Sequence, residues 1–214
     1  GRHIGYLDPT TKNAKTFRVC DPSLYDILAE IVRGGARNVS AIRQRRVLPN
    51  DTVYYERLLD LRGQTVHPEP ISRLQARQEW VQGAVQATQG CDVVFVDPDN
   101  GIGSKDQAYS RLGAKYVLLE ELIPYLDRGQ TLVIYHHLNR QAPAPDQING
   151  RMEQVRQTLG ASAEVMALRY RRGSARVFLV VPSQTHYQVL ADRVVQLTAS
   201  AWSQHFTRYL PLDP

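Results

Sequence analysis

The stretch from Cys91 to Gly103, which reads CDVVFVDPDNGIG, constrains the fold of this chain more than any other. Residues 92–96 are almost wholly apolar and β-branched or aromatic, which is typical of a strand buried on both faces. That run stops at the densest turn signal in the sequence, Asp97-Pro98-Asp99-Asn100-Gly101. Because ligands of open α/β sheets bind beyond the carboxyl ends of the strands, the stretch predicts a functional loop at the edge of a sheet.

Length and charge set broad limits on the kind of protein. A chain of 214 residues suits one α/β domain with a full core. Its net charge of +5, with arginines gathered at 43–46 and 169–172, permits a nucleic acid or nucleotide partner without demanding one. The chain has two cysteines and no run of about 18 apolar residues, so we expect a cytoplasmic protein with no membrane partner. It begins with Gly1 rather than Met, which leaves room for a preceding N-terminal segment.

The order of elements predicts a mostly parallel sheet that ends in an antiparallel hairpin. In the first part of the chain we expect a helix between Asp21 and Gly34, a strand over 38–42, a strand or a helix over 52–61, and a helix from Ser72 to Gly90. After it we expect a strand over 91–96 followed, beyond the loop, by a helix over 116–126, and then a strand over 131–135 followed by a helix over 148–159. Strands over 164–170 and 176–181 should then form a hairpin with its turn at 171–174. A long helix over 185–206 completes the chain.

This ending resembles the C-terminal half of class I S-adenosylmethionine-dependent methyltransferases, in which the seventh strand inserts antiparallel. In members that methylate exocyclic amines of bases, the fourth strand ends in (Asp/Asn)-Pro-Pro-(Tyr/Phe). Asp97-Pro98-Asp99-Asn100 lies at that position and matches two residues of the four. The resemblance covers residues 72–183 and implies a single α/β domain over 1–214, built as a Rossmann-like three-layer sandwich, with S-adenosylmethionine as cofactor. The loop is also similar to that of a set of uncharacterised bacterial proteins.

The resemblance implies catalytic roles for the four residues of the loop. In the family, the side chain equivalent to Asp97 and the backbone carbonyl that follows it accept hydrogen bonds from the target amine, which positions the nitrogen for methyl transfer. Asp97 and Pro98 fit that role. Asp99 and Asn100 depart from the pattern, since the family has an aromatic residue that stacks on the base where this chain has Asn100. A stacking ring would therefore come from elsewhere, with Tyr109 or Tyr135 as candidates.

Further polar residues leave the second strand at the same edge of the sheet. We expect Tyr135, His136 and Arg140 to contact the substrate there, together with Arg77 on the helix before the first strand. His136 and His137 are neighbours, and neighbouring side chains on a strand point to opposite faces. One of the two histidines at most therefore faces the Asp97 loop.

The methyl-donor site is the missing part of the pattern, and it keeps other functions open. The family has a glycine-rich loop after its first strand and an acidic residue at the end of its second. Here the one Gly-x-Gly, at Gly101 and Gly103, follows the wrong strand, so no cofactor-binding residues are predicted. One alternative is a hydrolase or nuclease in which Asp97, Asp99 and a histidine hold a divalent metal, and a glycosyltransferase with Mn²⁺ on Asp-x-Asp is another. A third is a non-catalytic module that binds nucleic acid or a protein.

Overall fold

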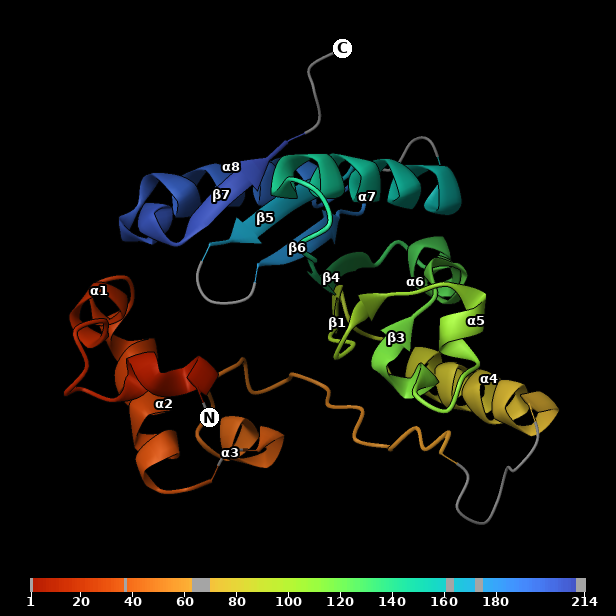
Figure 1. Cartoon of the computed structure of the whole chain (residues 1–214), viewed down its shortest axis with the longest axis horizontal. Coiled ribbons are helices and arrows are strands. Elements are labelled where there is room, and N and C mark those ends of the chain that lie inside the picture. The colour runs from red at the N-terminus through yellow and green to blue at the C-terminus, as the bar shows by residue number, and fades with distance from the viewer. Residues whose placement is uncertain (1, 37, 63–69, 161–163, 172–174, 211–214) are drawn as a thin grey trace.

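The computed structural model describes residues 2–36, 38–62, 70–160, 164–171 and 175–210 (Figure 1). Its strands are β1 (Val93–Val96), β2 (Gly101–Ile102), β3 (Tyr116–Val117), β4 (Thr131–His137), β5 (Met166–Tyr170), β6 (Arg176–Val181) and β7 (Phe206–Tyr209). Its α-helices are α1 (Ala14–Arg18), α2 (Pro22–Arg33), α3 (Val39–Gln44), α4 (Pro70–Ala87), α5 (Lys105–Ala108), α6 (Ile123–Asp127), α7 (Ala144–Leu159) and α8 (Tyr187–Ala199). Shorter 3-10 helices are η1 (Arg2–Leu7), η2 (Gly113–Lys115), η3 (Leu119–Leu122) and η4 (Ala201–Gln204).

The main sheet has five strands in the order β1-β4-β6-β5-β7 and is mixed. The predicted parallel pairing of the first two strands is confirmed, with Val93 opposite Thr131. The predicted antiparallel hairpin is also confirmed, as β5 with β6, although residues 172–174 of its turn lie outside the described residues. The prediction of a mostly parallel sheet is wrong, because β6 runs antiparallel to both of its neighbours, β4 and β5, and β7 runs antiparallel to β5.

Strand β1 lies at one edge of this sheet, which corrects the prediction that it is buried on both faces. Val94 is buried, but Val93 and Phe95 are 48% and 56% exposed. The strand pairs with β4 on one side, and no described strand pairs with its other side. Its apolar residues therefore alternate between a covered face and an open one, as in a half-buried strand.

Three predicted elements before β1 also need correction. Residues 39–44 form helix α3 instead of a strand, because the Asn38 side chain accepts the Ala41 N–H and caps the helix. Residues 52–61 form neither a strand nor a helix. Helix α4 begins at Pro70, so Ser72 falls within its first turn. The predicted helix α2 is confirmed, with Asp21 accepting the Leu24 N–H and Gly34 at the C-cap.

Two long predicted helices are broken into shorter elements. Residues 116–126 contain β3, η3 and all of α6 except Asp127, and Tyr116 of β3 pairs with Gly101 of β2. Residues 185–206 contain α8 and η4, and Phe206 begins β7. Helix α8 ends at Ala199 because Ser200 adopts an extended backbone and its hydroxyl accepts the Trp202 N–H. Within the described ranges, no helix has both the length and the apolar composition needed to cross a membrane.

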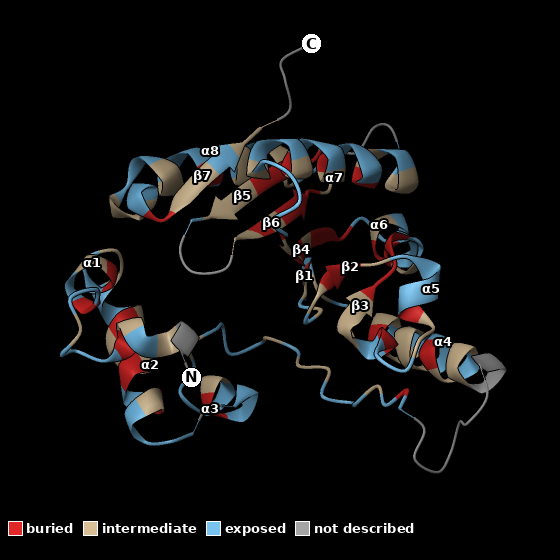
Figure 2. Ribbon diagram, in the orientation of Figure 1, coloured by how far each residue is buried: buried red, intermediate tan, exposed pale blue. Residues whose placement is uncertain are grey.

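Apolar residues of the sheet are packed into core clusters on both of its faces. Figure 2 colours the buried residues of the strands red. On one face, Ile134 and Leu179 pack with Ile148 of α7. On the other face, Val180 packs with Val194 of α8. Because neighbouring side chains of a strand point to opposite faces, the alternation along β4 and β6 allows helices to pack on both.

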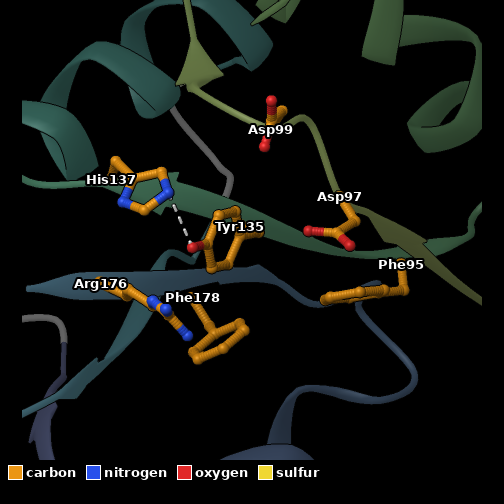
Figure 3. Close-up of a pocket in the computed structure, with 7 residues that line it drawn as sticks. All are labelled: Phe95, Asp97, Asp99, Tyr135, His137, Arg176 and Phe178. Atoms are coloured by element: carbon orange, nitrogen blue, oxygen red, sulfur yellow. Dashed lines mark hydrogen bonds between the residues drawn. The ribbon is translucent and has the colours of Figure 1, made fainter. Parts of the chain in front are cut away.

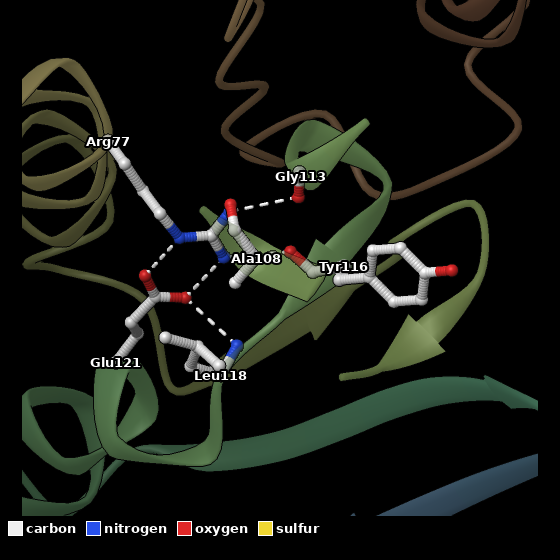
Figure 4. Close-up of polar contacts among 6 residues, drawn as sticks. All are labelled: Arg77, Ala108, Gly113, Tyr116, Leu118 and Glu121. Atoms are coloured by element: carbon white, nitrogen blue, oxygen red, sulfur yellow. Dashed lines mark hydrogen bonds and ion pairs between the residues drawn. The ribbon is translucent and has the colours of Figure 1, made fainter. Parts of the chain in front are cut away.

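Arg77 of α4 holds together the segment that follows β2 (Figure 4). The Arg77 side chain is 3% exposed, and its guanidinium forms a bidentate pair with Glu121, at 2.5 and 2.7 Å. It also donates to the carbonyl oxygens of Ala108, Gly113 and Tyr116. These bonds use every N–H that a guanidinium carries, so Arg77 is a structural residue of this segment.

We expect the Arg77→Lys substitution to lower the free energy of unfolding by about 1–3 kcal/mol, because lysine keeps the charge but leaves carbonyl oxygens that Arg77 binds without a donor. Lysine carries its charge on one compact ammonium group, so it cannot reproduce the planar arrangement of N–H donors of a guanidinium. Chemical denaturation followed by circular dichroism measures the change. Arg111→Lys, at an exposed position, is the matched control and should change the value by less than about 0.5 kcal/mol. Equal effects of the two substitutions would contradict the structural role of Arg77.

Candidate functional site

The loop after β1 is tied to the segment that Arg77 holds. The Gly101 N–H donates to the Pro98 carbonyl at 3.1 Å, which closes the turn. The Asn100 N–H donates to the Lys115 carbonyl at 2.8 Å. The Lys115 ammonium lies 2.6 Å from the carboxylate of Asp99. Backbone and side-chain bonds to one residue therefore fix the second half of the Asp97 loop.

The loop is also fixed to β4 through His136. Gly101 has a φ of +94°, and a Cβ there would lie 2.2 Å from His136 Nδ1, so this position requires glycine. The close approach allows the Ile102 N–H to donate to Nδ1 at 3.0 Å. Burial lowers the pKa of His136 to about 3, and the charges of Arg151 and His137 act in the same direction. The ring is therefore neutral at ordinary pH and acts as an acceptor that holds the loop.

Side chains from three strands and the loop surround an open hollow of about 690 Å³ (Figure 3). We call it the aromatic hollow, and it is lined by Phe95, Asp97, Asp99, Tyr135, His137, Arg176 and Phe178. The pairing register brings them together, since Tyr135 lies opposite Phe178 and His137 lies opposite Arg176. The Phe178 ring centroid is 5.6 Å from that of Tyr135 and 6.4 Å from that of Phe95. The hollow thus combines aromatic rings with acidic and basic groups on one face of the sheet.

Asp97 is the carboxylate at the mouth of the aromatic hollow. Partial burial raises its pKa, as does the charge of Asp99, while Arg176 and His137 oppose the shift. The Tyr135 hydroxyl lies 3.0 Å from His137 Nε2, a contact that orients both rings. Burial also raises the pKa of Tyr135, so its hydroxyl keeps its proton. The hollow therefore offers a carboxyl acceptor next to flat apolar surfaces.

A second hollow, of about 700 Å³, lies beyond the end of β4 and against α7. We call it the amide hollow, because carboxamides are prominent in its lining, from Asn100, Gln107, Asn139, Gln147 and Gln154. Asp146, Gly150 and Arg151 of α7 also line it. His136 lines this hollow, and His137 lines both hollows. The two hollows lie on opposite faces of the sheet, because neighbouring side chains of β4 alternate, and they meet at His137 at the end of the strand.

The structure brings some of the predicted site residues together and separates others. Asp97, Asp99 and Tyr135 line the aromatic hollow, with Pro98 between the two acids. Asn100 and His136 line the amide hollow instead. Arg140 is exposed beyond the end of β4, and it is in neither lining that the structure describes. Arg77 lies in the network with Glu121, where its N–H groups bind protein atoms in place of the predicted substrate.

Sequence reasoning missed Phe95 and Phe178 as site residues. Phe95 was assigned to a strand buried on both faces, so its exposure was not expected. Arg176 and Phe178 stand two apart at the start of β6, and the period of a strand places them on one face. The alternation was visible in the sequence, but the pairing of β6 with β4 was needed to bring these residues to Asp97.

Of the groups suggested as metal ligands, Asp97, Asp99 and His137 line the aromatic hollow together, but lining one hollow does not by itself make a metal site. In the described part of the chain, no three side chains from His, Cys, Asp and Glu are grouped so that they could hold a metal ion. Asp99 is paired with Lys115, and the Nδ1 of His136 accepts the Ile102 N–H. The divalent-metal alternative stays a prediction.

The low pKa of His136 predicts a loss of stability in acid. In the unfolded chain His136 takes up a proton near pH 6.5, whereas in the folded chain it does so near pH 3. Between these values the unfolded state binds more protons, so the free energy of unfolding falls as the pH is lowered, by up to about 1.4 kcal/mol per pH unit from this residue. Denaturation of the wild type and of His136→Asn at pH values from 8 to 4 measures how the free energy of unfolding of each protein depends on pH.

Asparagine retains an acceptor oxygen near the position of Nδ1 and does not titrate. The variant should therefore lose less stability than the wild type below pH 6.5. The difference between the free energies of unfolding of the two proteins at pH 8 gives the cost of the substitution itself. If the free energy of unfolding changed with pH in the same way for the two proteins, His136 would not be buried in the neutral form.

Comparisons with known proteins give no relative on which a function could be based. No protein-family model matches the chain, and neither a curated protein nor a solved structure matches it. A function must therefore be argued from the geometry and chemistry of the two hollows.

Proposed function

We propose that this chain is a methyltransferase-like module that recognises a planar group bearing an amino substituent, such as a nucleobase, in the aromatic hollow. The observation that carries the proposal is the position of the Asp97 carboxyl beside the rings of Phe95, Tyr135 and Phe178 on an open face of the sheet. Such a site suits single bases, because every base has a flat face that can stack on an aromatic side chain.

The chemistry of the hollow favours a base with an amino group. A carboxylate accepts hydrogen bonds, so Asp97 can accept from an exocyclic N–H. A protonated Asp97 carboxyl can also donate to the ring nitrogen beside that amine. The raised pKa of Asp97 keeps this protonated form present at higher pH than for an ordinary aspartate. Arg176 lines the same hollow and opposes the rise in the pKa of Asp97, so the ionised, hydrogen-bond-accepting form of Asp97 is also favoured.

The order of strands supports the relation to the methyltransferase fold. Strand β6 is inserted antiparallel between β4 and β5, as the last strand is in class I methyltransferases. The Asp97-Pro98 loop follows β1, which runs parallel to β4. Core residues of α7 and α8 lie on opposite faces of the sheet, which agrees with a three-layer Rossmann-like arrangement.

The described residues do not fit S-adenosylmethionine, so we limit the proposal to recognition. The space over Gly101 is filled by His136, and a Cβ on Gly103 would lie 2.8 Å from the ring of Tyr116. This Gly-x-Gly therefore packs against protein and leaves no room for a donor. The described residues before α4 form helices and extended chain, with no strand that could be followed by a donor loop.

Binding of adenosine and inosine, measured by titration calorimetry, tests the proposal. Inosine carries an oxygen in place of the amino group, so adenosine should bind more tightly. Asp97→Ala should weaken adenosine binding by about 1–3 kcal/mol, because the hydrogen-bond acceptor is lost. Asp97→Asn should retain binding, since its side-chain oxygen still accepts. Asp92→Ala, at an exposed acid before β1, is the control and should have no effect.

Phe95→Ala tests the stacking surface separately. We expect it to weaken adenosine binding by about 1–3 kcal/mol, as for other aromatic residues on which a base stacks. Phe95 is exposed, so the fold should survive, and circular dichroism will verify this. The matched control is Val93→Ala, an exposed residue of the same strand. If adenosine binding is absent, or does not depend on Asp97 and Phe95, the proposed function is wrong.

A titration with S-adenosylmethionine separates recognition from methyl transfer by this chain. Because Gly101 and Gly103 pack against protein, we expect no binding at concentrations up to about 1 mM. The calorimetric signal should equal that of the ligand injected into buffer. Binding with micromolar affinity would contradict our account of the donor site.

A further inference from the structure

The amide hollow contains a basic residue, Arg151, to which the described part of the chain supplies no acidic partner. Arg151 lies on α7, half-buried, and its guanidinium donates to the side-chain oxygen of Gln154. Among the residues that the structure describes, none forms an ion pair with it. Burial lowers the pKa of Arg151, which reflects the cost of holding its charge partly out of water. An anion at this place would offset that cost.

Other donors of the amide hollow are oriented by bonds already present. His136 Nδ1 accepts the Ile102 N–H, so the neutral ring carries its proton on Nε2, which is a donor. Gln154 accepts from Arg151 through its oxygen, which leaves its NH₂ group as a donor. The carboxylate of Asp146 is an acceptor, so it suits a hydroxyl group better than an anion. The anion is therefore expected at the side of Arg151.

His137 links this donor set to the aromatic hollow, because it lines both hollows. A ligand with a flat base at one end and an anion at the other could occupy the two hollows together. A planar guanidinium with several parallel N–H groups matches the oxygens of a phosphate. We propose that the amide hollow binds the phosphate of a nucleotide whose base occupies the aromatic hollow, with Arg151 as the anchor of the phosphate. This inference rests on the proposed function.

Calorimetric titration with adenosine monophosphate and with adenosine tests the inference. For the wild type, the monophosphate should bind about 10- to 100-fold more tightly than adenosine, as expected for hydrogen bonds to a charged group. Arg151→Gln should reduce the affinity for the monophosphate to that for adenosine and leave adenosine binding unchanged. Arg156→Gln, the same change five residues further along α7, is the matched control and should leave both affinities unchanged.

A second variant blocks the amide hollow without removing a charge. Gly150 lines this hollow, and a Cβ at this position would meet nothing within 4 Å. Gly150→Leu should fill the space and also favour the helix, because leucine is a better helix former than glycine. We expect an affinity for the monophosphate at least tenfold lower, adenosine binding as in the wild type, and an unchanged circular dichroism spectrum.

The outcomes separate this inference from the function on which it rests. If adenosine binds as proposed but the monophosphate binds no more tightly, the phosphate site is wrong and base recognition stands. The same holds if the preference for the monophosphate survives Arg151→Gln. If adenosine and the monophosphate both fail to bind, the proposed function itself is overturned.

Discussion

The bidentate pair between Arg77 and Glu121 is the interaction on which the candidate site depends. Arg77 binds the carbonyl oxygens of Gly113 and Tyr116, which flank Lys115. Lys115 in turn accepts the Asn100 N–H through its carbonyl and pairs with Asp99 through its ammonium. A buried arginine on α4 thus determines the shape of a loop that it does not touch. Arg77 was predicted to bind substrate, and the structure instead gives it a positioning role for the loop.

The features that sequence predicts best are those set by local chemistry. The cap at Asp21, the parallel pairing of β1 with β4 and the antiparallel hairpin each follow from a few neighbouring residues or from the length of a connection. The face on which a strand is covered follows from long-range packing, and here local reasoning fails. Val93 and Phe95 have the composition of buried residues, yet the strand lies at a sheet edge and leaves them exposed. Similarly, Phe206 begins a strand because β5 is available as a neighbour.

The candidate site shows the same division. Asp97 and Tyr135 could be predicted because one follows a strand and the other lies near the end of the neighbouring strand. Arg176 and Phe178 join them through the register of β6 against β4, which sequence alone does not determine. His136 was predicted to contact substrate, but its Nδ1 accepts a backbone N–H from the loop. Its neighbour His137 points into the aromatic hollow, as the alternation along a strand requires.

The two hollows differ in the charge that they offer, and this difference gives a ligand a direction. The aromatic hollow contains the two carboxylates of Asp97 and Asp99 against one arginine, Arg176. The amide hollow contains the single carboxylate of Asp146 and Arg151, for which no acidic partner is described. A phosphate placed beside Asp97 would meet a carboxylate, and a base placed beside Arg151 would leave the arginine charge without an anion. The favourable orientation therefore puts the base against the rings and the phosphate against α7. His137, between them, is bonded to Tyr135 on the side of the base. The order of charges along the edge of the sheet, more than the shape of either hollow, thus accounts for the specificity that we propose.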